Sequence, residues 1–477
     1  MTETAVVVAA AAALPDDVTS WIEHASGRSI AGARRVPGGN SRQAWFVDLD
    51  GPFGVPSGPG KGLAELFLRF DPKVHDDAGT FMSLNHEAEI FRALHGTGVT
   101  VPRVLAVHPS RQAVLSERID GDTWFYRITD IDEQVRVASD FIVNLAALHR
   151  LDPAALGLGE VLGPVRTVAE HATEEIRRLR VRSTGRDGAI DPLTSAALDW
   201  LECNVPAYDG QTVLVQGDTG PGNFMYRNGK VTAVVDWELA HFGDPMDDIA
   251  WLSLRTVQDT FTYLPDRLRE YEVLSGIAID EHRVWYYRLM AEVRLAGLTT
   301  RGGGALARAV DDGRDAGNVL IYGLLHRRLL LEAFGHAARF ELPAVDVGTP
   351  SKSLNEDAFA ATLGMLRAVA QRPGDALSSQ WVKSAARLVK YLRCADADGR
   401  RLADEELAEL SLVLDHRCAD LPAARAELDA LTASGALGSG QYIAHLWRRS
   451  QREGWLGRES SGALRTRSWP PLFREAD

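Results

Sequence analysis

Short apolar runs, separated by glycine- and proline-rich turns, fill the first 120 residues. Residues 16–27 have helical spacing and end at a glycine, which predicts a capped helix. Residues 83–98 show a second helical pattern that stops at glycines. Between and after these, alternating or β-branched runs predict strands at both ends of 33–50 and at 63–70, 101–109 and 113–121. We therefore expect a mostly antiparallel sheet that carries one helix.

Helical patterns dominate the rest of the chain, beginning at residues 130–152. The exception is 212–236, where three short apolar runs predict a small sheet set into a helical body. Pro, Gly and Ser cluster at 341–353, and five amphipathic patterns follow, at 357–372, 380–393, 404–417, 423–435 and 441–455. The fold class is thus α+β. We expect three parts: a β-rich lobe at 1–120, a helical lobe at 121–340 and an all-α domain at 346–477.

The composition fits an ordinary globular protein and removes several classes of function. The 477 residues are 45% hydrophobic and 25% charged, and so long a chain exceeds the usual size of one hydrophobic core. A net charge of -13 without clustered Lys or Arg argues against a nucleic-acid partner. Three cysteines without a CxxC pair argue against a disulfide framework or a zinc site. The apolar opening stretch is too short to span a bilayer and lacks a basic flank, so we expect a cytoplasmic protein without a membrane anchor.

A tight turn is indicated at Asn228-Gly229, between two β-prone runs, which predicts a hairpin with a type I′ turn. Such a turn pairs Arg227 with Lys230. Regular alternation then sets two further pairs opposite each other: Asn223 with Val234, and Pro221 with Asp236. The side chains of Asn223 and Asp236 would therefore share the open end of the hairpin, within about 7 to 8 Å.

Carboxylate and amide oxygens would gather at this open end. Such ligands suit Mg²⁺, which takes one or two protein groups and leaves other positions for phosphate and water. Asp218 precedes Asn223 on a short Gly-containing loop and can reach the same site. A carboxylate beside a metal-bound nucleotide can accept or orient the proton of an attacking hydroxyl. Taken singly, these residues would be turn, strand-start and helix-cap residues, but their order and spacing favour a site for Asp218, Asn223 and Asp236.

The sequence Asp-x-x-x-x-Asn, followed by a hairpin and a second Asp, resembles the catalytic loop and metal-binding aspartate of the protein-kinase-like superfamily. The motifs QGD, GN, DWE and GDPxxD resemble the aminoglycoside-phosphotransferase family in particular, and most of all the phosphotransferase-type domains fused to acyl-CoA dehydrogenases. The resemblance covers about residues 20–335 and implies a two-lobed kinase-like fold with ATP between the lobes. It implies that Asp218 is the catalytic base, that Mg²⁺ is held by Asn223 and Asp236, and that the loop is braced or rimmed by Asp244 and Asp248.

The resemblance also implies a nucleotide site in the β-rich lobe. One part of it would be a Gly-Gly turn made of Gly38, Gly39, Asn40 and Ser41. Its backbone N–H groups could bind phosphates, although such turns are also common where no ligand binds. Arg69 takes the position of the family's phosphate-gripping lysine and Glu87 that of its ion-pair partner, while both could equally be surface charges. The connector whose backbone would bind adenine comprises Glu117, Arg118 and Ile119.

Two departures from the family pattern leave two hypotheses open. Gln216 stands where the family usually carries histidine, and Arg69 replaces lysine with a bidentate group of different geometry. The chain is either an enzyme that uses Mg²⁺ and ATP, with GTP as an alternative nucleotide, to phosphorylate a hydroxyl of a small molecule, or a catalytically weak pseudokinase that binds nucleotide in a regulatory or interaction role. Retention of Asp218, Asn223 and Asp236 together favours the enzyme.

The phosphate acceptor and the role of the terminal helices stay open. An antibiotic aminocyclitol, a hydroxyacyl thioester, a choline-like alcohol and a sugar all present a hydroxyl, and we favour a metabolite over a drug. The terminal helices could form a homodimer, cover the acceptor site or bind another partner.

Overall fold

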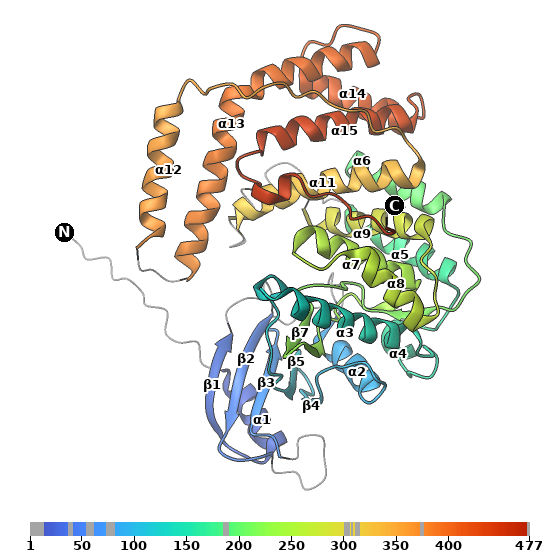
Figure 1. The fold of residues 1–477 in the computed structure, drawn as a ribbon, viewed down its shortest axis with the longest axis vertical. Coiled ribbons are helices and arrows are strands. Elements are labelled where there is room, and N and C mark those ends of the chain that lie inside the picture. Colours follow the sequence, from blue (N-terminus) through green and yellow to red (C-terminus); the bar gives the residue numbers. More distant parts are fainter. Residues whose placement is uncertain are drawn as a thin grey trace, which may run out of the picture.

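The computed structural model describes residues 14–36, 42–53, 62–72, 82–184, 190–299, 306, 309–310, 315–372 and 376–474. Figure 1 shows a small lobe of strands at one end of the molecule and a larger helical body beside it. The C-terminal helices lie on the side of that body away from the strands. The predicted α+β class is confirmed.

Five antiparallel strands form the sheet of the N-terminal lobe, in the spatial order β1-β2-β3-β5-β4. Their bounds are Ile30–Val36 (β1), Gln43–Leu49 (β2), Glu65–Phe70 (β3), Val104–Val107 (β4) and Ala113–Glu117 (β5). Helix α1 (Asp16–Ser26) ends at Gly27, which adopts a left-handed φ of 64°. Helix α2 (Leu84–Leu94) is capped by Ser83, whose hydroxyl accepts the N–H of His86. Each predicted strand and helix of this lobe is present.

The two faces of this sheet are covered differently. Side chains two residues apart on β2, β3 and β5 form one hydrophobic cluster with Val18 and Ile22 of α1; they include Trp45, Val47, Leu66, Leu68, Ala113 and Leu115. On the other face, Val104 and Val114 belong to the cluster of α2 and the helical lobe. Helix α1 therefore covers one face of the sheet, and α2 packs between the other face and the helical lobe.

The predicted hairpin forms, but its register is shifted by one residue. Strands β7 (Phe224–Arg227) and β8 (Lys230–Val234) are joined by Asn228 and Gly229, both at positive φ, and Arg227 pairs with Lys230. A bulge then makes Phe224 the partner of Val234. The predicted pairs Asn223 with Val234 and Pro221 with Asp236 are therefore wrong.

Thr232 is the extra residue of the bulge, because Tyr226 pairs with Val231 and Met225 pairs with Ala233. Regular alternation counted from the turn takes no account of such a residue, so the predicted register fails by one position. The extra residue leaves Asn223 facing Val235, whose N–H donates to the Asn223 carbonyl oxygen at 2.9 Å.

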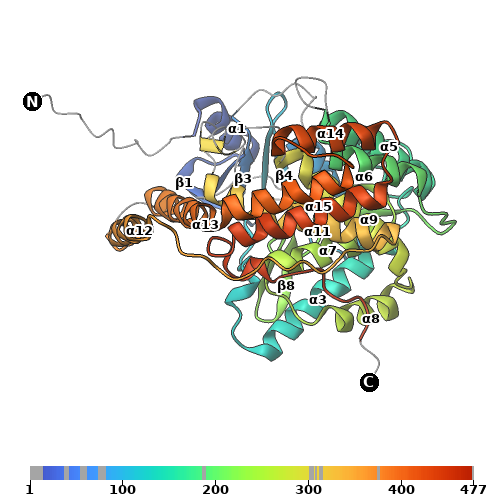
Figure 2. The same cartoon turned by 90° about the horizontal axis from the view of Figure 1, so that it is seen from above.

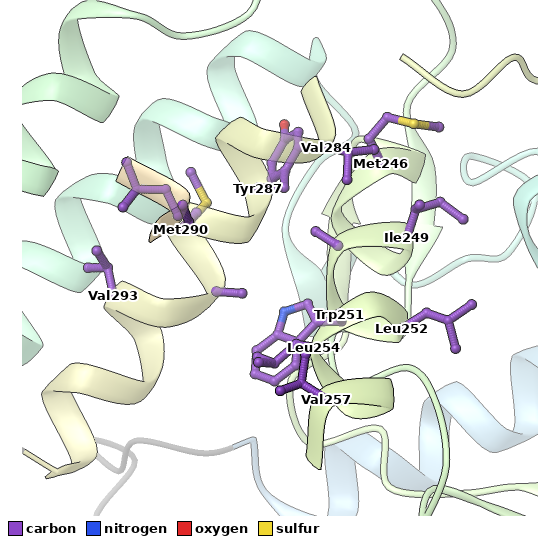
Figure 3. Packing of buried hydrophobic residues seen from close by; sticks show 14 of the residues in the cluster. Met246, Ile249, Trp251, Leu252, Leu254, Val257, Val284, Tyr287, Met290 and Val293 are labelled. Carbon is purple, nitrogen blue, oxygen red and sulfur yellow. The ribbon is translucent and has the colours of Figure 1, made fainter. Parts of the chain in front are cut away.

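The helical lobe encloses two short sheets, β7-β8 and β6 (Val213–Val215) with β9 (His241–Gly243). Its helices are α3 (Ile131–His149), α4 (Gly159–Leu162), α5 (Val168–Ser183), α6 (Pro192–Cys203), α7 (Pro245–Gln258), α8 (Leu264–Ser275), α9 (Glu281–Thr299) and α11 (Ala316–Ala338). A 3-10 turn at Phe125–Arg127 precedes α3. Helices α7 and α9 pack together, with Trp251 and Leu254 on the side of α7 that faces α9 (Figure 3). This packing fixes α7, which carries several residues of the candidate site.

The C-terminal helices are α12 (Glu356–Ala370), α13 (Ala376–Val413), α14 (Leu421–Ala433) and α15 (Ser439–Leu456), followed by a 3-10 turn at Gly462–Arg465. The prediction of separate helices at 380–393 and 404–417 is wrong, because α13 runs without a break through 38 residues. No helix in the described parts of the chain is both long enough and apolar enough to cross a membrane.

These terminal helices are attached to the helical lobe. Helices α13 and α15 pack on α11, and Leu410, Tyr442 and Leu446 belong to the same hydrophobic cluster as the lobe. The chain end then returns to the lobe, where Arg467 donates to the carbonyl oxygens of Val257 and Gln258, each at 2.7 Å. The division of the chain into domains at residues 120 and 346 stays a prediction.

Candidate active site

One buried carboxylate on α7 fixes the loop that follows β6. Asp248 accepts hydrogen bonds from the backbone N–H groups of Gln216 and Gly217, each at 2.9 Å, and from the hydroxyl of Thr219. His149 Nε2 lies 3.0 Å from the same carboxylate. Because Asp248 is fully buried, these groups replace the water that it lacks. Asp248 therefore braces the loop, as the sequence predicted.

The loop is also tied to the segment after β8. Gln216, at the position where the family usually has histidine, donates from Nε2 to the Val235 carbonyl oxygen at 2.8 Å. Gly217 has a φ of 82°, and a Cβ there would lie 2.3 Å from the Leu239 carbonyl oxygen, so only glycine fits. The neutral amide thus links the two segments that carry Asp218 and Asp236.

The Asp218 carboxylate faces a guanidinium from the last turn of α7. Arg255 Nε donates to Asp218 Oδ1 at 2.8 Å, and its NH2 group donates to Oδ2. Burial raises the pKa of the Asp218 carboxyl, the nearby charge of Asp236 adds to that rise, and Arg255 opposes it. The charges of Asp218 and Asp236 also raise the pKa of Arg255, although burial acts to lower it. Asp218, Asp236 and Arg255 therefore share one electrostatic environment.

Asp236 and Asn223 offer oxygens suited to a hard cation. Asp236 Oδ1 is buried and has no hydrogen-bond partner among the described residues, and Arg69 NH2 is 3.9 Å from it. The residue adopts a left-handed φ of 64°, an uncommon conformation that often marks functional positions. Asn223 Nδ2 donates to the Asp218 carbonyl oxygen at 2.7 Å, so a cation would use the amide oxygen.

These two residues fit Mg²⁺ better than a transition metal. No group of three His, Cys, Asp or Glu side chains able to hold a metal occurs within the ranges that the structure describes. Mg²⁺ does not need such a group, because one or two protein oxygens suffice when phosphates and water complete its coordination. Asp236 Oδ1, which has no hydrogen-bond partner among the described residues, and the amide oxygen of Asn223 meet that requirement.

The predicted pair on the β-rich lobe is present and reaches the same site. Arg69 NH1 of β3 lies 2.6 Å from Glu87 Oε1 and 2.8 Å from Oε2. Glu87 also accepts the backbone N–H of Trp237 at 3.1 Å. Because Trp237 directly follows Asp236, this buried carboxylate connects α2 to the candidate metal ligand.

The other residues predicted to contact the nucleotide lie in the Gly-Gly turn and in the connector after β5. Gly38, Gly39, Asn40 and Ser41 lie outside the described residues. The connector begins at the end of β5, where Glu117 exchanges backbone and side-chain hydrogen bonds with the backbone of Arg103. Arg118 lies over the Phe46 ring, 4.3 Å from its centroid, and Ile119 follows it toward the helical lobe.

Three charged residues of the site carry no sequence-derived role. Arg255 is one. The others are Arg42 and Glu238, whose NH1 and Oε2 atoms are 3.1 Å apart. Burial and the neighbouring Asp236 raise the pKa of Glu238 to about 7. Glu238 could have been predicted from its place in the DWE motif. Arg42 and Arg255 could not, because no motif distinguishes them from surface arginines.

The other two aspartates after the hairpin are structural. Asp244 caps α7 by accepting the N–H of Met246 at 2.9 Å, and it also binds Arg283. Asp247 accepts two hydrogen bonds from Arg294, at 2.8 and 2.9 Å. Both therefore hold α7 to its neighbours.

The two lobes, the braced loop and the ion pair between β3 and α2 define a kinase-like fold. In agreement, the chain is similar in structure to a protein of Ralstonia eutropha classed as an aminoglycoside phosphotransferase, with a TM-score of 0.51 and 19% identity over 68% of this chain and 97% of that one. The profile of the Phosphotransferase enzyme family, APH, matches residues 32–285. The chain belongs to this family, and the predicted resemblance and two-lobed fold are confirmed.

Curated relatives resemble part of the chain. Acyl-CoA dehydrogenase family member 11 of Rattus norvegicus is 27% identical over 194 residues, which is 38% of this chain and 23% of the relative. Acyl-CoA dehydrogenase family member 10 of Mus musculus is 27% identical over 206 residues, which is 40% of this chain and 18% of the relative. The chain thus matches a quarter or less of the length of these relatives.

Proposed function

We propose that the chain is a kinase that uses Mg²⁺ and ATP to phosphorylate a hydroxyl group of a small molecule. The observation that carries this proposal is the electrostatic environment shared by Asp218 and Asp236. The Asn223 side chain donates a hydrogen bond to the Asp218 backbone carbonyl oxygen in the same place. Membership of a phosphotransferase family supports the reaction class. GTP would present the same phosphates to the same groups.

Asp218 is the proposed catalytic base. Its carboxylate would accept or orient the proton of the acceptor hydroxyl as that oxygen attacks the terminal phosphorus. Arg255 would keep the carboxylate in one orientation through its bidentate contact. Since phosphoryl transfer gains mostly from positioning and charge stabilisation, a fixed carboxylate contributes directly to rate.

Asn223 and Asp236 are the proposed ligands of Mg²⁺, through the amide oxygen and the unpartnered carboxylate oxygen. When bound, the ion would neutralise charge on the nucleotide phosphates and fix their orientation. Arg69, held by Glu87 and 3.9 Å from Asp236, would contact a phosphate of the nucleotide. The adenine contacts are proposed for Glu117, Arg118 and Ile119, and further phosphate contacts for Gly38, Gly39, Asn40 and Ser41.

The acceptor is proposed to be a hydroxylated metabolite. The relatives named as acyl-CoA dehydrogenase family members favour a metabolic acceptor, such as a hydroxyacyl thioester, over an antibiotic. An aminoglycoside, a choline-like alcohol and a sugar are the alternatives that an acceptor screen must include.

The proposal is tested by ATP consumption in the presence of Mg²⁺ with a panel of these four acceptor classes. One acceptor should raise the rate above basal hydrolysis, and Asp218→Ala should lower that rate about 1,000-fold or more while nucleotide affinity stays within a few-fold. Asp132→Ala, an exposed change on α3, is the matched control and should leave the rate unchanged. Nucleotide binding without turnover on any acceptor would instead favour the pseudokinase.

A further inference from the structure

Helix α12 stands at the edge of the molecule, supported by α13. Figures 1 and 2 both show it on the outer side of α13, away from the helical body. None of its fifteen residues from Glu356 to Ala370 is buried. A helix so exposed gains little from tertiary packing, which is the usual source of helix stability.

The sequence of α12 is nevertheless apolar on two opposite faces. Phe359, Leu363 and Leu366, at helical spacing, are its half-buried residues. The opposite face carries a second apolar stripe of Ala358, Ala361, Met365, Ala368 and Val369. Met365 is 69% exposed and Val369 49% exposed. Exposed apolar side chains gathered on one face of a helix are the pattern of an interaction site.

The second stripe is complementary to itself in an antiparallel arrangement. When two copies of α12 cross with the dyad between Gly364 and Met365, Ala361 of each copy meets Ala368 of the other, and Met365 meets Gly364. A Cβ added at Gly364 would meet nothing within 4 Å, so a methionine of a second copy has room there. Small residues at the crossing let two helices approach to about 8 Å.

The charges at the ends of the stripe agree with the same arrangement. Asp357 lies in the first turn of α12 and Arg372 two residues beyond its end, and both are exposed. The dyad between Gly364 and Met365 brings Asp357 of one copy to Arg372 of the other. A parallel pairing would instead set like charges side by side, which is destabilising.

We infer that this chain forms a two-fold symmetric dimer in which α12 of one copy packs antiparallel on α12 of a second copy. The hairpins of α12 and α13 from both copies then make a four-helix interface, with the same patch used on both sides. The two candidate active sites lie outside this interface. The inference does not depend on the proposed function.

The dimer is tested by sedimentation equilibrium on the full chain from about 0.5 to 50 μM. The wild type should give twice the chain mass of 52.1 kDa. Met365→Glu should raise the dissociation constant at least 100-fold, because it places a carboxylate at the dyad, while circular dichroism stays unchanged. Leu412→Glu, at an exposed position near the C-terminal end of α13 and far along that helix from α12, is the control and should stay dimeric. A monomeric wild type at 50 μM, or a dimeric Met365→Glu variant, would overturn the inference.

A charge exchange tests the antiparallel orientation. Asp357→Lys and Arg372→Glu should each weaken self-association about 10-fold, because each homodimer then sets like charges together. Mixing the two variants should restore association, seen as energy transfer between differently labelled copies. If the mixture associates no better than the separate variants, the antiparallel pairing is wrong.

Discussion

Asp218 and Arg255 form a bidentate ion pair that joins the loop after β6 to the last turn of α7. Both side chains are largely shielded from solvent. The planar guanidinium matches both carboxylate oxygens, so the pair sets the rotation of the carboxylate as well as its position. Because these surroundings contain little water, the Coulomb attraction between the two charges is stronger than in an exposed surface ion pair.

The first prediction concerns the role of Arg255 as a positioning residue. Arg255→Lys keeps the charge but cannot bind both oxygens, so we expect kcat to fall about 10-fold. Arg255→Met removes the charge too, and we expect a fall of about 100-fold. The nucleotide KM should change less than 3-fold in both variants, because Arg255 holds Asp218 and not the nucleotide.

Steady-state kinetics against acceptor and nucleotide provide the measurement. Arg177→Met, at an exposed position of α5, is the matched control and should behave as the wild type. A wild-type kcat in the lysine variant would contradict the bidentate role, since charge alone would then suffice to hold Asp218.

The second prediction concerns Glu87, which is buried and binds Arg69. In Glu87→Gln the Arg69 guanidinium loses its main partner. The Asp236 carboxylate, whose Oδ1 lies 3.9 Å from Arg69 NH2, is then the next charged group within reach. Arg69 should then compete with the cation for that carboxylate. We expect the free Mg²⁺ concentration for half-maximal rate to rise about 10-fold at saturating ATP, with smaller effects on the acceptor KM.

Initial rates titrated with Mg²⁺ test this expectation. Glu89→Gln is the control, because Glu89 lies on the same helix but is exposed and pairs with the exposed Arg92. An unchanged Mg²⁺ requirement in Glu87→Gln would argue against Asp236 as a metal ligand.

Much of the site could be predicted because its key signals are local in sequence. Asn228-Gly229 dictates a tight reversal, since both residues tolerate positive φ, and this reversal brings the segments of Asn223 and Asp236 together. The strands of the N-terminal lobe follow from alternation of apolar residues. Such features depend on backbone preference and burial, which a single sequence shows.

The parts that could not be predicted depend on distant contacts. Arg255 lies 37 residues after Asp218, and its partner is determined by how α7 packs. The bulge in β8 inserts Thr232 into the strand, which the alternation of apolar residues does not reveal. The continuity of α13 through Gly399 is likewise a tertiary effect, since glycine weakens an isolated helix. Packing overrides local preference in each case.

The third prediction concerns the carboxylate that braces the loop after β6. Asp248 accepts from two backbone N–H groups and the Thr219 hydroxyl, and it also contacts His149. Asp248→Asn leaves one acceptor oxygen and adds a buried amide donor, so we expect a loss of about 2–4 kcal/mol in the free energy of unfolding. Urea denaturation provides the measurement. Asp132→Asn, at an exposed position of α3, should change it by less than about 0.5 kcal/mol, and equal losses in both variants would refute the bracing role.

The last prediction concerns acid stability of the C-terminal helices. Glu409 lies close to His445 Nδ1 at 2.8 Å, Arg448 Nε at 2.7 Å and Arg452 NH2 at 2.6 Å. Burial opposes ionisation, but these partners outweigh it and hold the pKa of Glu409 at about 2. Because the folded pKa lies below the unfolded value near 4.5, the contribution is present above pH 4.5 and is lost as the pH falls toward 2.

Glu409→Gln removes this contribution, so the variant should be less stable than the wild type by about 1–2 kcal/mol at pH 6, because solvent screens part of the interaction at this half-buried site. The difference should narrow below pH 4.5 and approach zero near pH 2, because the wild-type carboxylate is then protonated as well. Glu405→Gln on the same helix is the control, since its exposed pair with Arg401 adds only a few tenths of a kcal/mol. Urea unfolding at several pH values gives the comparison. A difference that stays constant from pH 6 to pH 3 would show that Glu409 contributes through packing and not through its charge.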